Sequence, residues 1–183
     1  MLKVGISGKI ASGKSEVENI LQFLGYNVFD LDKISHNLLE NNEKIKEQIL
    51  AEFKTLDRKK LGKIIFDDIN QKQKLENIIH PELKETILEI FNENKKEKVV
   101  FISGALLFKT GFDKLFDKTI FISADDEIRL ERLIKRNNLS KKEALSRLNL
   151  QDDGNKADYI IENNNNIENL KTEIQKLLKE LNI

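Results

Sequence analysis

The chain has 183 residues, of which 39% are hydrophobic and 34% are charged, which is enough for one domain with a buried core. Its 31 basic and 31 acidic residues cancel, so the overall charge excludes a general attraction to nucleic acid or to an anionic membrane. The absence of cysteine excludes disulfides, thiolate catalysis and cysteine-bound metal centres. No apolar run approaches the roughly 20 residues that span a bilayer, and the first predicted strand starts at Leu2, so we expect no signal peptide and a cytoplasmic location.

Short apolar runs alternate with longer helical patterns along the chain, which is typical of β-α-β units around a parallel sheet. We predict five strands, over residues 2–7, 26–29, 98–103, 118–123 and 158–162. The interval 33–96 has apolar residues at helical spacing and no strand, and it is far longer than the crossover of about a dozen residues that a parallel pair needs. We therefore predict a helical insertion with a function of its own, and one more amphipathic helix over 167–181.

The eight residues from Gly8 to Ser15, GKIASGKS, occupy every fixed position of the phosphate-binding loop G-x-x-x-x-G-K-[ST], between an apolar run and an amphipathic helical pattern. Gly8 and Gly13 allow the backbone to curl so that successive N–H groups point at one anion. We expect Lys14 to be an exposed loop residue that reaches the β and γ phosphates, and the Ser15 hydroxyl to bind Mg²⁺. The loop therefore predicts binding of a nucleoside triphosphate together with Mg²⁺, and the predicted nucleotide contacts of this segment are Gly8, Ile10, Ala11, Ser12, Gly13, Lys14, Ser15 and Glu16.

Two carboxylates, Asp30 and Asp32, follow the second predicted strand in the sequence DLD. Residues at the carboxyl end of a strand beside a phosphate loop face the ligand crevice of an α/β sheet, so we expect at least one of them near the γ-phosphate. Alternating positions point to opposite faces, so one carboxylate could accept a proton from the attacking hydroxyl or hold Mg²⁺ through water, while the other could cap a helix that begins at Lys33. Asp32 is equally a candidate N-cap, and the spacing leaves capping and catalysis open.

Arginine is rare in this chain, with five residues against 26 lysines, and four of the five fall between positions 129 and 147. Arg129, Arg132 and Arg136 are three and four residues apart, so they line one face of a helix, and Arg147 follows on a second helix. Arginine in a chain that otherwise uses lysine favours planar, two-point contact with phosphate oxygens. We therefore predict an arginine-bearing lid over about 132–156 that closes on the transferred phosphoryl group.

Taken together, these motifs resemble the dephospho-coenzyme A kinases over nearly the whole chain. That family has D-A-D after the second strand with a His or Arg four residues on, then D-R-x-x-L and L-E-x-I-I-H-P in its insertion and P-L-L-F-E after the third strand. Its lid carries R-L-x-x-R and R-x-x-x-Q, followed by A-D-x-x-I-x-N. The matching residues here are Asp30, Asp32, His36, Asp57, Arg58, Leu61, Leu75, Glu76, Ile78, Ile79, His80, Pro81, Leu106, Leu107, Phe108, Arg132, Leu133, Arg136, Arg147, Gln151, Ala157, Asp158, Ile161 and Asn163.

The resemblance implies an α/β fold of the P-loop NTPase class, with a five-stranded parallel sheet flanked by helices. The nucleotide-binding core would cover 1–32 and 97–183, and the helical substrate-binding insertion would cover 33–96. The implied reaction is transfer of the γ-phosphate of ATP to the 3′-hydroxyl of dephospho-coenzyme A, with no nucleic acid or membrane as partner. The implied catalytic residues are Lys14, Asp32 as the base, Arg132 and Arg136.

The resemblance also implies further binding residues. Arg136, Arg147 and Asn163 would join the phosphate loop in binding the nucleotide. The acceptor substrate would be bound by Asp32, His36, a turn at His80 and Pro81, and Leu106.

Two other functions fit the same residues. One is another small-molecule or nucleoside monophosphate kinase on the same scaffold. The other is a nucleotide-binding sensor without turnover, which is allowed because Ala105 and Lys109 stand where the family has proline and glutamate. ADP formation that depends on an added acceptor would separate a kinase from a sensor.

Overall fold

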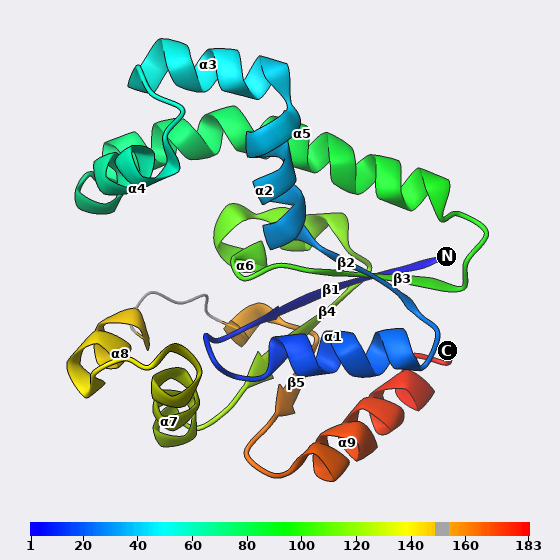
Figure 1. The fold of residues 1–183 in the computed structure, drawn as a ribbon. Helices are drawn as coiled ribbons and strands as arrows, with labels where there is room; N and C mark the ends of the chain where they lie inside the picture. Colours follow the sequence, from blue (N-terminus) through cyan, green and yellow to red (C-terminus); the bar gives the residue numbers. More distant parts are fainter. Residues whose placement is uncertain (149–153) are drawn as a thin grey trace. The chain divides into compact units, whose positions relative to one another are not determined.

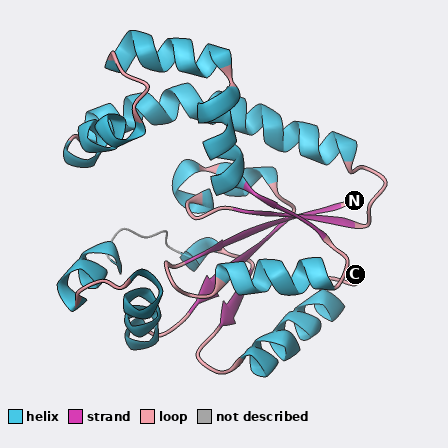
Figure 2. Cartoon of the chain, viewed as in Figure 1, coloured by secondary structure: helices cyan, strands magenta, loops and turns pink. Residues whose placement is uncertain are grey.

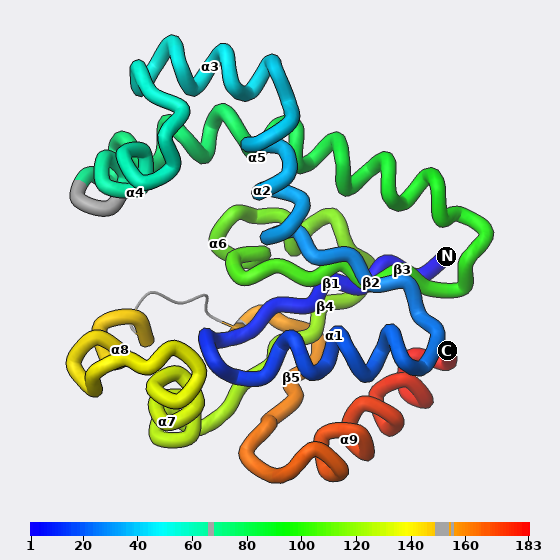
Figure 3. The backbone as a smooth tube through the Cα atoms, viewed as in Figure 1, coloured from blue at the N-terminus to red at the C-terminus, as the bar shows by residue number. Residues whose placement is uncertain are grey.

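The computed structural model describes residues 1–148 and 154–183. The chain forms two compact units, one of Met1–Asp30 with Asn94–Ile183, and one of Leu31–Glu93. The backbone leaves the first unit after Asp30 and re-enters it at Asn94 (Figure 3). The predicted lid of 132–156 includes residues 149–153, and with them Gln151, which lie outside the described part of the chain.

The first unit contains a five-stranded, all-parallel sheet, which confirms the predicted fold class (Figure 2). The strand order is β2-β3-β1-β4-β5, so the N-terminal strand lies in the middle of the sheet. Every strand end lies within one residue of its predicted position. The strands are β1 (Leu2–Gly8), β2 (Asn27–Asp30), β3 (Val99–Ser103), β4 (Lys118–Ser123) and β5 (Tyr159–Glu162).

Helices α1 (Lys14–Phe23) and α9 (Ile167–Glu180) lie side by side on one face of this sheet (Figure 1). Their apolar residues pack against the strands in one buried cluster. The spacing of four residues places Val17 and Leu21 on one face of α1, and this face belongs to the same cluster as Val4 and Ile6 of β1. The other members are Val99, Phe101, Ile120, Ile122, Ile161, Leu170, Ile174, Leu177 and Leu178.

Two short helices after β3, α6 (Leu107–Thr110) and the 3₁₀ helix η1 (Phe112–Leu115), supply aromatic side chains to the sheet. The rings of Phe108 and Phe121 meet edge to face with centroids 6.1 Å apart. The ring of Phe116 lies so close to β1 that a Cβ at Gly5 would come within 2.8 Å of it. Gly5 therefore has a packing role in the strand that carries the phosphate loop.

Helices α7 (Asp126–Asn137) and α8 (Lys141–Leu148) form a second, smaller core, and the 3₁₀ helix η2 (Gly154–Lys156) leads into β5. Leu133 of α7 and Ala144 of α8 are fully buried in this core. Ile10 and Ala11 of the phosphate loop pack against the same cluster. The helix that carries the arginines is thus attached to the phosphate loop by apolar contact.

The second unit is helical and has a core of its own. Its helices are α2 (Leu31–Asn41), α3 (Glu43–Phe53), α4 (Arg58–Asp67) and α5 (Ile69–Glu93). Side-chain caps fix two of the helix starts, because Asn42 accepts a hydrogen bond from the N–H of Ile45 and Asp57 accepts one from the N–H of Lys60. Asp57, which matches the D-R-x-x-L motif, therefore has a structural role. The buried core residues are Ile45, Ile49, Phe53, Leu61, Leu75 and Ile79.

Two local predictions were wrong. Helix α2 begins at Leu31, directly after β2, so Asp32 lies in the first turn of the helix and is not the residue before a helix that starts at Lys33. The segment of His80 and Pro81 is not a turn, because α5 runs without a break from Ile69 to Glu93. Pro81 removes one backbone donor from this helix, but Ile79 and Leu83 on either side of it are buried and hold the helix together. Within the two described stretches, no helix has both the length and the apolar character needed to cross a membrane.

Candidate active site

The phosphate loop connects β1 to α1 and has the curled backbone that the sequence predicts. Gly13 has φ 98° and Ala11 has φ 60°, so two of its residues adopt the left-handed region. A Cβ at Gly8 would lie 2.7 Å from the carbonyl oxygen of Ile122, so only glycine fits where the loop leaves the sheet. The loop ends at the N-terminus of α1, where the first backbone N–H groups of a helix have no partner within the helix and favour an anion.

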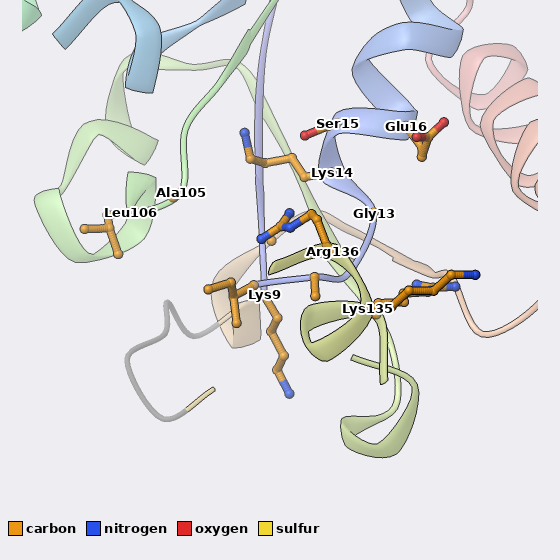
Figure 4. Close-up of a pocket in the computed structure, with 13 residues that line it drawn as sticks. Lys9, Gly13, Lys14, Ser15, Glu16, Ala105, Leu106, Lys135 and Arg136 are labelled. Carbon is orange, nitrogen blue, oxygen red and sulfur yellow. The ribbon is translucent and has the colours of Figure 1, made fainter. Parts of the chain in front are cut away.

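A cavity of about 660 Å³ lies over this loop (Figure 4). Among the described residues, its lining carries five cationic side chains and one carboxylate, Glu16. This charge excess suits a polyanionic ligand such as a triphosphate. The lining residues are Gly8, Lys9, Ile10, Ala11, Gly13, Lys14, Ser15, Glu16, Ala105, Leu106, Arg132, Lys135 and Arg136.

Ser12 does not line the cavity, but the hydrogen bonds that its carbonyl oxygen accepts fix the shape of the loop. Asn163, at the end of β5 and only 6% exposed, donates a hydrogen bond from Nδ2 to Ser12 O at 2.8 Å. Arg132 donates from Nη1 to the same oxygen at 3.4 Å and from Nη2 to Asn163 O at 3.0 Å. The two bonds to Ser12 O hold the peptide that precedes Gly13, and the third joins Arg132 to Asn163, so together they orient the N–H groups that would face a phosphate.

Lys14 is not an exposed loop residue, contrary to the prediction. It is the first residue of α1, and its side chain is 15% exposed. Its ammonium lies 2.7 Å from Oε1 of Glu18, one helical turn further on, and 3.5 Å from Oγ of Ser103 at the end of β3. Glu18 was not predicted as a site residue, although a charged residue between Val17 and Leu21 on an apolar helix face is a signal that could have identified it.

The remaining arginines of the first unit differ in their surroundings. Arg129 is 3% exposed and donates to the carbonyl oxygen of Ile10 and to the carboxylate of Asp126. The hydrogen bond and the charge of Arg129 lower the pKa of the Asp126 carboxyl. Arg136 is exposed and lines the cavity, whereas Arg147 lies on the exposed side of α8 outside the cavity lining. Of the three arginines on this face of α7, Arg129 is buried and structural, whereas Arg132 and Arg136 line the cavity.

Comparison with known proteins shows the family of the chain. The pattern of the family described as dephospho-CoA kinase matches residues 2–169. The chain belongs to the dephospho-CoA kinase family. The dephospho-CoA kinase of Oceanobacillus iheyensis is 36% identical over an alignment of 196 positions, which covers 100% of this chain and 98% of that protein. The corresponding kinase of Listeria innocua is 36% identical and covers 93% of this chain and 92% of the relative.

Solved structures give the same result for the fold. The structure of the Campylobacter jejuni dephospho-CoA kinase has a TM-score of 0.70 at 33% identity, and the match covers 98% of this chain and 96% of that one. A shikimate kinase of Bacteroides thetaiotaomicron matches with a TM-score of 0.53 at 14% identity, which shows only a common P-loop kinase fold. As a member of the dephospho-CoA kinase family, the chain is a kinase that acts in the final step of coenzyme A biosynthesis.

The residues that the family resemblance assigned to the acceptor fall on both units. Leu106 lines the cavity of the first unit, together with Ala105, which the site prediction omitted. Asp32, His36, His80 and Pro81 belong to the helical unit.

Within the helical unit, His36 has two charged neighbours. Nη1 of Arg58 lies 2.8 Å from its Nε2, and Oε1 of Glu40 lies 3.2 Å from the same nitrogen. Since a guanidinium can only donate, the contact with Arg58 requires that Nε2 of His36 accept. His80 lies in α5, where burial lowers its pKa and the nearby charge of Glu76 opposes part of that shift.

Lys9 and Lys135 are two further cavity residues that the sequence analysis did not identify. Lys9 occupies a variable position of the phosphate-loop motif, and Lys135 lies next to Arg136 in a lysine-rich chain. Neither position carries a pattern that separates it from the other lysines. Only the fold places both side chains at the cavity.

Proposed function

We propose that this protein transfers the γ-phosphate of ATP to the 3′-hydroxyl of dephospho-coenzyme A, and that it does so in the cytoplasm. The observation that carries the proposal is the cationic cavity over a complete phosphate loop, in a chain that belongs to the dephospho-CoA kinase family. Phosphoryl transfer demands little covalent chemistry from the protein, so catalysis rests on positioning and on neutralising charge. Both requirements match the residues that line this cavity.

On the nucleotide side, the backbone N–H groups of the loop and the N-terminus of α1 bind the β-phosphate. Lys14 neutralises the β and γ oxygens from the start of α1, and Arg136 reaches the transferred group from α7. Arg132 both lines the cavity and holds the carbonyl of Ser12, so it combines contact with phosphate and support of the loop. Asn163 contributes by holding the same carbonyl, and Arg147 would reach the nucleotide from α8.

Ser15 is the proposed protein ligand of Mg²⁺, because its hydroxyl is an oxygen donor at the cavity. Within residues 1–148 and 154–183, no three His, Asp or Glu side chains form a group that could hold a metal ion. This donor set suits Mg²⁺, which keeps several waters and binds to the phosphates of its nucleotide. When bound, the ion would neutralise charge on the β and γ oxygens.

On the acceptor side, Asp32 is the proposed base that takes the proton of the 3′-hydroxyl as the new O–P bond forms. The helical insertion, predicted over 33–96, would bind dephospho-coenzyme A through His36, His80 and Pro81. Leu106 would contact the acceptor from the first unit. These assignments rest on the resemblance of the motifs and on the chemistry of the side chains.

An acceptor screen tests the proposed function. The purified protein is given ATP and Mg²⁺ with dephospho-coenzyme A, AMP, CMP, shikimate or no acceptor, and ADP formation is measured. We expect ADP only with dephospho-coenzyme A, together with a product that carries a 3′-phosphate. Faster turnover with AMP, CMP or shikimate would assign another substrate, and nucleotide binding without ADP formation on any acceptor would make the protein a sensor.

A further inference from the structure

Helix α1 carries one carboxylate on its buried face. Val17, Glu18 and Leu21 are the buried residues of this helix, and the side chain of Glu18 is only 10% exposed. Glutamate is rarely kept in such surroundings unless it is paired, because burial penalises the charged form. Glu18 is paired with Lys14, at 2.7 Å between Oε1 and Nζ.

The orientation of this pair does not favour the helix. A glutamate that precedes its lysine by four residues stabilises a helix better than the reverse order does, and here the lysine comes first. Lys14 also places a positive charge at the positive end of the helix dipole. Helix stability therefore does not explain the pair. Lys14 belongs to the phosphate-loop motif and lines the cavity, so the pair bears on the binding of the nucleotide.

The ammonium of Lys14 is the group that would interact with the phosphates of a bound nucleotide. Glu18 does not line the cavity, but its carboxylate is paired with Lys14, which does. A carboxylate and a phosphate that both attract one ammonium weaken each other's interaction with it, and by thermodynamic linkage the coupling is reciprocal. The pair is largely buried, so solvent screens the carboxylate only weakly.

We infer that Glu18 competes with the phosphates of the nucleotide for Lys14 and thereby weakens nucleotide binding, which favours release of ADP after transfer. The inference rests on the proposed function, because it takes the loop cavity as the nucleotide site. Glu18 is a positioning residue in this account, because it acts on the nucleotide through Lys14. Its carboxylate offsets one of the five cationic charges at the cavity without occupying the cavity.

Calorimetric titration with ADP tests this inference. Glu18→Gln keeps the shape of the side chain and removes its charge. We expect this variant to bind ADP at least about fivefold more tightly than the wild type, which is the low end of the usual coupling between two binding interactions. Glu18→Leu, which suits the apolar face of α1, should show the same direction and serves if the glutamine variant folds poorly. A merely structural role for Glu18 predicts equal or weaker ADP binding in both variants, and that result would overturn the inference.

Two comparisons separate an effect through Lys14 from a general effect of charge. In a Lys14→Met background, the additional change Glu18→Gln should leave ADP affinity unchanged, and an equal gain in both backgrounds would refute competition for Lys14. The matched control is Glu168→Gln, which removes the partner of Lys171 at 2.8 Å on the exposed side of α9. The control should bind ADP like the wild type.

If the wild type itself binds no ADP, the nucleotide site and this inference both fail. If the wild type binds ADP and the Glu18 variants bind it equally well, the inference alone is refuted.

Discussion

Replacing Lys14 by alanine should cost stability as well as activity. The change removes the ammonium 2.7 Å from the Glu18 carboxylate and leaves that carboxylate 10% exposed without this partner. Removing one member of a fully buried pair costs about 3–5 kcal/mol. The Lys14 side chain is 15% exposed and water reaches the vacated space, so we expect about 2 kcal/mol. For a chain of this size that loss corresponds to a fall in Tm of about 4–8 °C.

Urea denaturation followed by circular dichroism measures the loss, and ADP formation measures the activity. The double variant Lys14→Ala with Glu18→Gln is the matched control, because it removes the isolated charge and keeps the lysine absent. It should regain most of the unfolding free energy and remain inactive. If the single variant unfolds at the wild-type urea midpoint, or if the double variant is no more stable than the single one, Lys14 and Glu18 do not form an energetically significant pair.

Three further predictions concern the base, the arginines and the half-buried His80. Asp32→Asn should lower kcat by about 10²-fold or more with little change in the KM for ATP; a variant that loses only thermal stability would remove Asp32 as the base. Arg132→Lys and Arg136→Lys keep the charge but lose the planar contact, so both variants should have a lower kcat. Arg132→Lys should also raise the KM for ATP, because Ser12 O loses a donor. If both variants keep the wild-type kcat and KM, neither arginine acts on the transferred phosphoryl group. Since burial lowers the pKa of His80, its neutral form stabilises the fold above about pH 6.5, the unfolded-state value, and this stabilisation is lost as the pH falls through the lower folded-state pKa. The urea midpoint of His80→Asn should therefore decline less than that of the wild type between pH 7.5 and 5, and parallel declines would contradict this account.

The sequence predicts the first unit well because its determinants are local. Each strand is a short apolar run, and the phosphate loop is marked by glycines at fixed spacing, of which Gly13 adopts φ 98°. The start of α2 is different, because the chain passes from strand to helix between Asp30 and Leu31 without a turn residue. The pattern of apolar residues does not resolve a boundary of one or two residues, so the place of Asp32 was missed.

The uninterrupted helix through Pro81 and the partner of Lys14 depend on tertiary contacts. A proline predicts a break, but Ile79 and Leu83 are buried on both sides of it, and this packing outweighs one lost backbone bond. Glu18 has the spacing of a helix neighbour of Lys14, yet only the burial of that face shows that the two charges are held together. The distinction between Arg129, which is buried, and Arg136, which is exposed, likewise requires the packing of α7.

The bond between Asn163 and the carbonyl of Ser12 spans 151 positions of the chain. The phosphate loop is synthesised before β5, so one of the donors that fix its central peptide arrives only after the loop itself. A growing chain therefore lacks this hydrogen bond until the residues of β5 and Asn163 have been synthesised. A fragment that stops before β5 would contain the complete phosphate-loop motif and still lack the shorter of the two side-chain hydrogen bonds that hold the carbonyl of Ser12.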